Sequence, residues 1–83
     1  MTIQDVYNEV APLAEQVLQI PQFDSSVSMM TEPNWDSLRH VQLLSACERK
    51  FSVVIDDDQA FKLTSADKLV RYLHDALQRT SKQ

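Results

Sequence analysis

The sequence predicts an all-α fold: a small four-helix bundle with a long loop between the first and second helices and a short third helix. The chain of 83 residues contains no glycine, which removes Gly-rich phosphate loops and most tight hairpin turns. Strand-like alternation of apolar and polar residues is missing, and apolar residues instead recur three and four positions apart. A chain of this length forms a single domain, 1–83, with a polar tail at about 80–83 that we expect to fray.

The first helix is expected from Thr2 to Ile20. Its apolar positions lie at helical spacing: Ile3, Val6, Val10, Leu13, Val17 and Ile20. Pro12 interrupts this helix, and an interior proline removes a backbone hydrogen bond and clashes with the preceding turn, at a cost of about 3 kcal/mol. Because the apolar phase continues across it, we expect a kinked helix or a break near Val10 to Pro12.

A long loop is predicted from Pro21 to Asn34, which is rich in Ser, Asp, Thr and Pro and has no helical phase. Loops of this length in a compact domain are usually functional or held down by their own side chains. Five apolar residues could hold it: Phe23, Val27, Met29, Met30 and Trp35. We expect the first two to complete the core, and for the other three a contact with a partner stays open.

The second helix follows the turn-prone pair Pro33-Asn34. Asp36 or Ser37 can cap it by accepting a hydrogen bond from a free backbone N–H group. One narrow stripe is predicted to be buried: His40, Leu43, Leu44, Cys47 and Phe51. Roughly the opposite side carries Leu38, Val41, Gln42, Ser45 and Arg49. Leu38 and Val41 are thus apolar residues that the core does not need, and next to Ser37 they indicate a docking surface.

The rest of the chain predicts a short helix and a long one. Asp56-Asp57-Asp58 follows the apolar link Val53 to Ile55, and acidic residues at a helix start favour the positive end of its dipole. This acidic cluster lacks the spacing, glycine and distant glutamate of an EF-hand calcium loop. Thr64 with Asp67 resembles a capping box that opens the last helix. The buried stripe of that helix is Ala66, Leu69, Val70, Leu73, Ala76 and Leu77.

Charge and cysteine content exclude several classes of function. The net charge is −4 and the eight Lys and Arg residues are scattered, which disfavours nucleic acid and anionic membranes as partners. The single Cys47 allows no internal disulfide and offers no metal cluster. Without a signal peptide or a membrane-length apolar run, we expect a cytoplasmic monomer.

Catalysis is not expected. Ser37 and His40 are three residues apart and could form a nucleophile–base pair. A working pair also needs an orienting third group, oxyanion donors and a dry pocket, for which a bundle of this size has little room. We therefore expect His40 to be a core or boundary histidine and His74 to face the solvent.

The tripeptide Asp36-Ser37-Leu38 at a helix start, with Val41, Leu43 and Phe51 downstream, resembles the modification motif of acyl carrier and peptidyl carrier proteins. The similarity runs from Asn34 to about Tyr72, and before it only length and helical periodicity agree. In that family the motif serine carries phosphopantetheine through a phosphodiester, and the terminal thiol of this arm holds cargo as a thioester. The resemblance implies a bundle of acyl-carrier type with 4'-phosphopantetheine on Ser37.

The same resemblance implies a discrete carrier of acyl or aminoacyl intermediates and not an enzyme. Its partners would be a phosphopantetheinyl transferase, an acyl- or aminoacyl-loading enzyme, and a downstream synthase or transferase. The residues expected to contact them are Asp36, Leu38, Arg39, Val41, Gln42 and Ser45.

The chain departs from many fatty-acid carriers, which have a glycine shortly before the motif and a strongly acidic second helix. Here Asn34-Trp35 stands in that region, and three cations offset Glu48: Arg39, Arg49 and Lys50. The usual docking of an acidic helix into basic enzyme patches is therefore in doubt. Trp35 directly before the motif resembles free-standing carriers of polyketide, nonribosomal-peptide or other specialised pathways.

Two other readings stay open at this point. One is a helical protein-interaction module whose Ser37 is never modified. The other is a small helix-turn-helix DNA-binding protein, against which the negative net charge and the weakly basic second helix count.

Overall fold

The structure is a computed structural model, and it describes residues 1–81. It contains four helices: α1 (Ile3–Leu18), α2 (Ser37–Phe51), α3 (Asp57–Ala60) and α4 (Ala66–Ser81). Within the described range the chain forms no strand beyond one isolated bridge between Ser28 and Ser65. The predicted all-α bundle with a long first loop and a short third helix is confirmed. α4 extends into the tail predicted at about 80–83, of which 82–83 lies outside the described residues.

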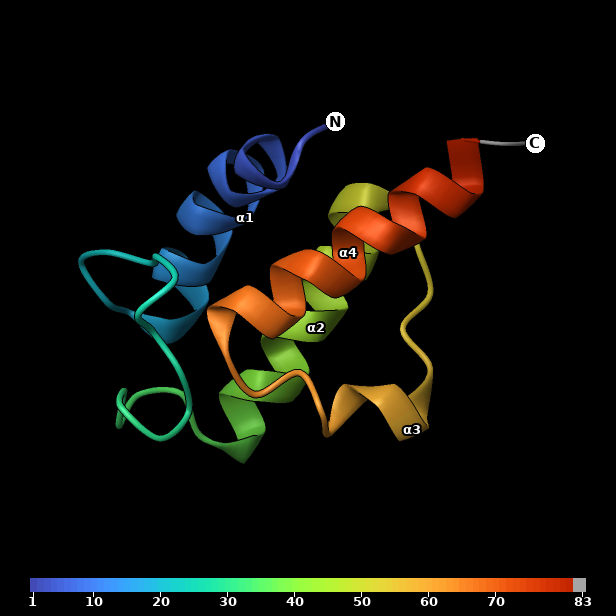
Figure 1. The fold of residues 1–83 in the computed structure, drawn as a ribbon. Coiled ribbons are helices and arrows are strands. Elements are labelled where there is room, and N and C mark those ends of the chain that lie inside the picture. Colours follow the sequence, from blue (N-terminus) through green and yellow to red (C-terminus); the bar gives the residue numbers. More distant parts are fainter. Residues whose placement is uncertain (82–83) are drawn as a thin grey trace.

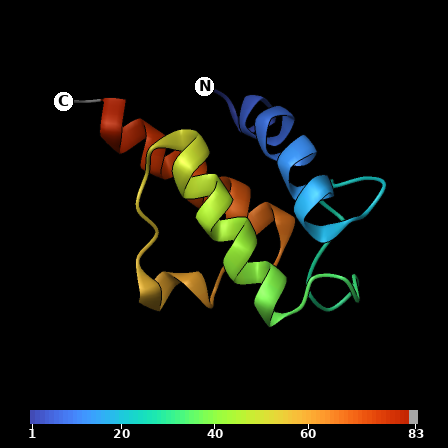
Figure 2. The same cartoon turned by 180° about the vertical axis from the view of Figure 1, so that it is seen from behind.

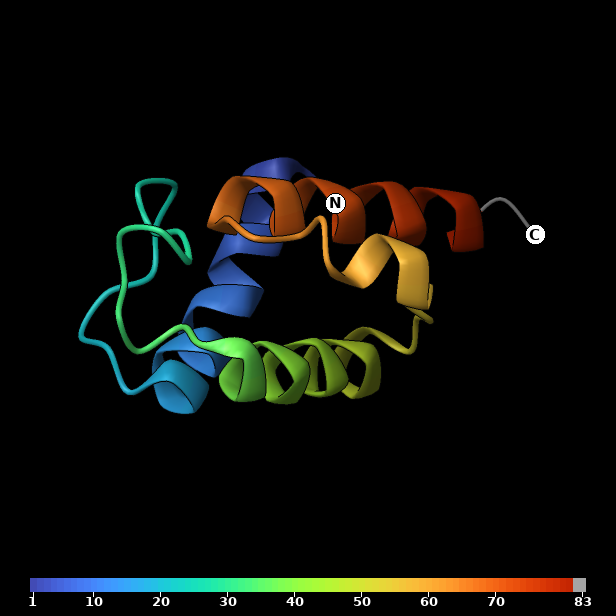
Figure 3. The ribbon, with the colours of Figure 1, turned by 90° about the horizontal axis from the view of Figure 1, so that it is seen from below.

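The three long helices form two layers with α1 spanning them. Figure 3 shows α2 and α4 as separate layers, with α1 crossing between them at one end and α3 placed between them at the other. α1 contacts both α2 and α4. The start of α1 and the end of α4 lie on the same side of the molecule (Figure 1). Seen from behind, the loop 19–36 leads from the end of α1 to the start of α2 (Figure 2).

α1 begins with a capping box formed by Thr2 and Asp5. The Thr2 hydroxyl accepts from the Asp5 N–H at 3.1 Å, and the Asp5 carboxylate accepts from the Thr2 N–H at 2.9 Å. The helix is continuous across Pro12, so the break considered near Val10 to Pro12 is wrong. Pro12 is exposed, while Val10 and Ala14 are fully buried and hold the helix against the core on both sides of it.

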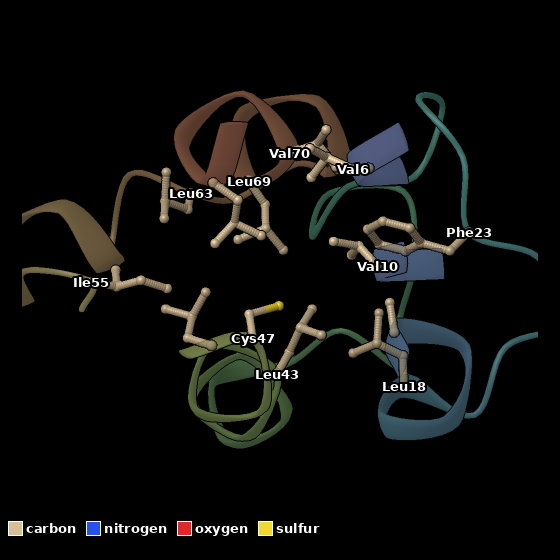
Figure 4. Close-up of a cluster of buried hydrophobic side chains, with 14 of the residues drawn as sticks. Val6, Val10, Leu18, Phe23, Leu43, Cys47, Ile55, Leu63, Leu69 and Val70 are labelled. Atoms are coloured by element: carbon tan, nitrogen blue, oxygen red, sulfur yellow. The ribbon is translucent and has the colours of Figure 1, made fainter. Parts of the chain in front are cut away.

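The core joins the buried stripes of α1, α2 and α4. Figure 4 shows Leu43 and Cys47 of α2 pointing toward Leu69 of α4. The predicted stripes of α2 and α4 are buried, except that Phe51 and Leu77 are only partly covered. The periodicity of the sequence therefore predicted the packing faces of these two helices correctly.

The long loop is held down by its own apolar residues. Phe23 and Trp35 are buried, with ring centroids 6.0 Å apart. Val27 and Met29 are partly buried against the core, whereas Met30 is exposed. Trp35 is thus a core residue and Met30 is accessible to a partner.

α4 is capped by Ser65 and not by Thr64. The Ser65 hydroxyl accepts from the Lys68 N–H at 3.2 Å. The Thr64 carbonyl instead accepts from the Met29 N–H at 2.9 Å, because the loop pairs with the chain just before α4. The predicted capping box of Thr64 and Asp67 is therefore wrong.

His74 does not face the solvent as expected. Its side chain is mostly covered, and Nε2 lies 3.0 Å from the carbonyl oxygen of Met1. The start of the chain folds back onto α4 at this point.

Two further observations concern the described residues as a set. No helix among them is long and apolar enough to cross a membrane. Within 1–81 no three His, Cys, Asp or Glu side chains come together as metal ligands.

Candidate cofactor-attachment site

Ser37 is the first residue of α2, and Asp36 caps the helix. Asp36 has an extended backbone (φ −99°, ψ −177°), and its Oδ1 accepts from the Arg39 N–H at 2.9 Å. Ser37 is exposed, and no group among residues 1–81 forms a hydrogen bond with its hydroxyl. Because Asp36 does the capping, the Ser37 hydroxyl is available for chemistry.

The surroundings of Ser37 suit a phosphodiester. The first backbone N–H groups of a helix and its dipole favour a negative group at the N-terminus. A phosphate on Ser37 Oγ would lie at this end of α2. A phosphopantetheine group there supplies a flexible arm whose terminal thiol forms thioesters. The exposed hydroxyl and the helix start therefore fit this cofactor.

The surface after Ser37 is apolar and nearly uncharged. Leu38 is 69% exposed and Val41 is 59% exposed, although both are large aliphatic residues. Gln42 is exposed and Ser45 is partly exposed beside them. The structure thus brings four of the predicted docking residues to one accessible face of α2.

Arg39, which the sequence predicted to contact partners, is bound to the end of α1. Its Nη1 donates to the carbonyl oxygens of Leu18 at 3.2 Å and Val17 at 3.4 Å, which are among the last carbonyls of α1. Asn34 adds a second link, since its side-chain amide donates to the Gln19 carbonyl at 3.1 Å. These contacts fix the start of α2, and with it Ser37, against the end of α1.

Both ring nitrogens of His40 have hydrogen-bond partners other than Ser37. It is 4% exposed, its Nδ1 lies 3.0 Å from the indole nitrogen of Trp35, and its Nε2 lies 2.8 Å from the Ala60 carbonyl oxygen. Because both ring nitrogens are engaged elsewhere, His40 cannot act as a base for Ser37 in this arrangement. The predicted core role of His40 is confirmed.

Cys47 offers no alternative thiol for holding cargo. It is fully buried, and burial raises the pKa of its thiol to about 12. The thiolate is the reactive form, so Cys47 is inert in the folded chain.

A cavity of about 350 Å³ lies between α2 and α3. It is lined by residues of both elements: His40, Val41, Leu44, Ser45 and Glu48 from α2, and Ile55, Asp57, Ala60 and Phe61 from α3 and its flanks. Two docking residues, Val41 and Ser45, also line it. The cavity therefore adjoins the accessible face of α2.

Comparisons with known proteins agree with this site. Residues 8–73 match the family described as "phosphopantetheine attachment site". The acyl carrier proteins of Helicobacter pylori strains G27 and HPAG1 are each 35% identical to this chain over 66 residues, which is 78% of this chain and 85% of theirs. The protein of strain J99 is 33% identical over the same length.

Fold, site and matches together define a phosphopantetheine-binding carrier. The chain belongs to the acyl carrier protein family. It is therefore a carrier and not an enzyme, and it holds acyl thioesters on a covalently attached 4'-phosphopantetheine. Proteins of this family work with a phosphopantetheinyl transferase and with loading and synthase enzymes.

Proposed function

We propose that Ser37 carries the 4'-phosphopantetheine arm, on which acyl or aminoacyl intermediates are held as thioesters and delivered to partner enzymes. The observation that carries this proposal is the exposed hydroxyl of Ser37 at the first position of α2. This hydroxyl is not needed as a helix cap, because the Asp36 side chain caps α2. Leu38 and Val41 beside it give a transferase an apolar foothold.

We assign partner contacts to a docking face made of Asp36, Leu38, Arg39, Val41, Gln42 and Ser45. Arg39 contributes from its edge, because its guanidinium is bound to α1. Exposed negative charge lies on and next to α3, at Asp56, Asp57 and Asp58. Partners are therefore expected to present an apolar pocket to α2 and basic side chains to α3.

The pathway we propose is a polyketide, nonribosomal-peptide or other specialised one. Its support is the absence of an acidic face on α2, where Glu48 is outnumbered by Arg39, Arg49 and Lys50, and the presence of Trp35 before the motif. We further propose a cytoplasmic monomer that acts without nucleic acid or membrane. The acidic composition and the reduced, buried Cys47 support this part.

Intact mass measurement after incubation with coenzyme A and a promiscuous phosphopantetheinyl transferase tests the attachment residue. The wild-type chain should gain the mass of one phosphopantetheine, and Ser37→Ala should gain none. Ser25→Ala is the matched control, because this serine is exposed in the long loop and lies outside the docking face, and it should be modified fully. An unchanged wild-type mass, or a gain that survives in Ser37→Ala, would contradict the proposal and favour an unmodified interaction module.

A loading comparison tests the pathway. The modified chain and a Helicobacter pylori acyl carrier protein are offered to the same acyl-loading enzyme of fatty-acid synthesis. We expect this chain to be loaded at least about tenfold less efficiently, because its α2 lacks the acidic face that such enzymes bind. Equal loading would place it in fatty-acid synthesis.

A further inference from the structure

α3 is too short to be stable alone. It has four residues, none of them buried, and its N-cap residue Asp56 forms no side-chain cap hydrogen bond. Isolated helices of this length do not persist in water. Contacts from outside α3 must therefore hold it in place.

Two kinds of contact hold α3. Ile55 before it and Leu63 after it are buried and anchor its flanks. Between these anchors, the carbonyl oxygen of Ala60 receives a side-chain hydrogen bond from His40 on α2, at 2.8 Å from Nε2. The same oxygen also accepts from the Leu63 N–H at 3.3 Å, so it closes the end of α3. Before α3, Glu48 of α2 accepts from the Ile55 N–H at 2.8 Å. His40 is therefore the polar link from α2 to the end of α3, and Glu48 is the link to its start.

Trp35 determines which ring nitrogen of His40 carries the proton. The indole N–H of Trp35 can only donate, and it lies 3.0 Å from His40 Nδ1, so Nδ1 must be the acceptor. In a neutral ring the proton is then on Nε2, which donates to Ala60. Trp35 is 2% exposed, and its ring centroid is 5.9 Å from that of His40. Since the pair is buried, water does not compete for these hydrogen bonds.

We propose that His40 is a positioning residue which, held in its Nε2–H form by Trp35, sets the position of α3 along α2. This inference deepens the proposed function and rests on it in one respect, namely that partners contact both α2 and α3. Ala60 and Phe61 form one wall of the cavity between α2 and α3, and Val41 and Ser45 form the other. The His40 hydrogen bond thus joins the two walls at the end of α3, as the Glu48 contact to Ile55 joins them at its start.

Nitrogen-15 NMR of the histidine rings in the wild-type chain is the first test. We expect the ring of His40 to be protonated at Nε2 and unprotonated at Nδ1 at neutral pH, and the indole proton of Trp35 to exchange slowly with water. A proton on Nδ1 would overturn the proposal. This measurement needs no variant and no modified Ser37.

Backbone order parameters of α3 are the second test. In His40→Phe, which keeps a ring but removes both hydrogen bonds, the values for residues 57–61 should fall toward about 0.6, while those of α2 and α4 stay near about 0.85. His40→Gln keeps an N–H donor and an oxygen acceptor, and it should restore most of the lost order. His74→Phe is the matched control and should leave α3 unchanged. Unchanged order in α3 of a folded His40→Phe, or an equal loss in all helices, would contradict the proposal.

Transferase kinetics connect the link to function. In His40→Phe the KM of the carrier for the phosphopantetheinyl transferase should rise about tenfold with kcat within about twofold, because recognition changes and the Ser37 hydroxyl does not. His40→Gln should recover most of the KM, and His74→Phe should behave as wild type. An unchanged KM would overturn the role in positioning. If the wild-type chain is not modified at all, the proposed function fails, and the two NMR tests still decide the role of His40.

Discussion

The hydroxyl of Tyr7 on α1 donates to the carboxylate of Asp67 on α4, across 3.3 Å. Asp67 also accepts from Arg71 Nε at 2.8 Å, and this hydrogen bond holds the pKa of Asp67 below its usual range. Burial, and then the negative charge of Asp67, raise the pKa of Tyr7 to about 12. This polar link therefore joins α1 to α4.

This link predicts a stability change at alkaline pH. Unfolded Tyr7 ionises near 10.0 and folded Tyr7 at about 12, so its contribution is fully present below pH 10 and is lost as the pH rises toward 12. Urea unfolding of wild type and Tyr7→Phe between pH 8 and pH 12 should show a steeper loss in the wild type, since lysine ionisation is common to both. Parallel curves would contradict this assignment.

At acidic pH the dependence is reversed, and the free energy of unfolding falls as the pH falls. Because the pKa of Asp67 is lowered on folding, its contribution is present above the unfolded pKa of about 3.8 and is lost as the pH falls through the folded value. Asp67→Asn should flatten the decline in the free energy of unfolding below about pH 4. A decline as steep as that of the wild type would show that other carboxylates account for it.

Arg39 should contribute to the stability of the fold more than to the charge of the docking face. Arg39→Ala removes the hydrogen bonds to the last carbonyls of α1 and should lower the free energy of unfolding by about 1–2 kcal/mol. Arg49→Ala, at an exposed position of the same helix, should change it by less than about 0.5 kcal/mol. Equal effects in a denaturant titration would mean that the α1 contact contributes nothing.

Leu38 and Val41 should matter for partners and not for folding. Because both are largely exposed, Leu38→Ala and Val41→Ala should leave the free energy of unfolding within about 0.5 kcal/mol of wild type. Each should lower kcat/KM with the phosphopantetheinyl transferase by about tenfold. Val54→Ala is the control, since Val54 is exposed but lies beyond α2. A loss as large in this control would show that the effect is not specific to the docking face.

Cys47 should be silent in thiol labelling. With a pKa of about 12, its thiolate fraction at pH 8 is about one in ten thousand, and the residue is fully buried. Native modified protein should therefore take up one alkyl group, on the arm, and denatured protein two. Rapid native labelling of the unmodified chain would contradict the buried placement of Cys47.

Replacing Pro12 should make the protein more stable. It leaves the Asn8 carbonyl without the usual donor four residues later, so Pro12→Ala should raise the free energy of unfolding by about 1–3 kcal/mol. Pro21→Ala, outside the helix, should give no such gain. A fall in melting temperature for Pro12→Ala would show that the rigidity which Pro12 gives to the chain stabilises α1 more than the missing hydrogen bond destabilises it.

Local signals were sufficient to predict the exposure of Ser37 and its neighbours, whereas the role of Ser37 as an attachment residue was inferred from the family resemblance and stays a prediction. The exposure of Ser37, Leu38 and Val41 follows from turn chemistry at Pro33-Asn34 and from the periodicity of one helix, and both act over a few residues. The same reasoning predicted the buried stripe of α4. Residues close in sequence determine such features, so a single sequence contains them.

Contacts between distant segments could not be predicted in the same way. Periodicity places the Cα of Arg39 on α2, but its long side chain reaches carbonyls at the end of α1. Thr64 and Ser65 both satisfy the capping rule, and the pairing of the long loop with residue 64 decides between them. The link from Trp35 through His40 to Ala60 needs three segments to be placed first.

Trp35 can serve as an intrinsic fluorescence probe of this carrier, so no added label is needed. It is the only tryptophan of the chain, it is buried, and it lies two residues before Ser37. Because the indole N–H of Trp35 donates a hydrogen bond to the imidazole of His40, the intrinsic fluorescence of Trp35 should change when this pair is disturbed. Emission from this one indole can therefore report, in real time, on events at the neighbouring helix start.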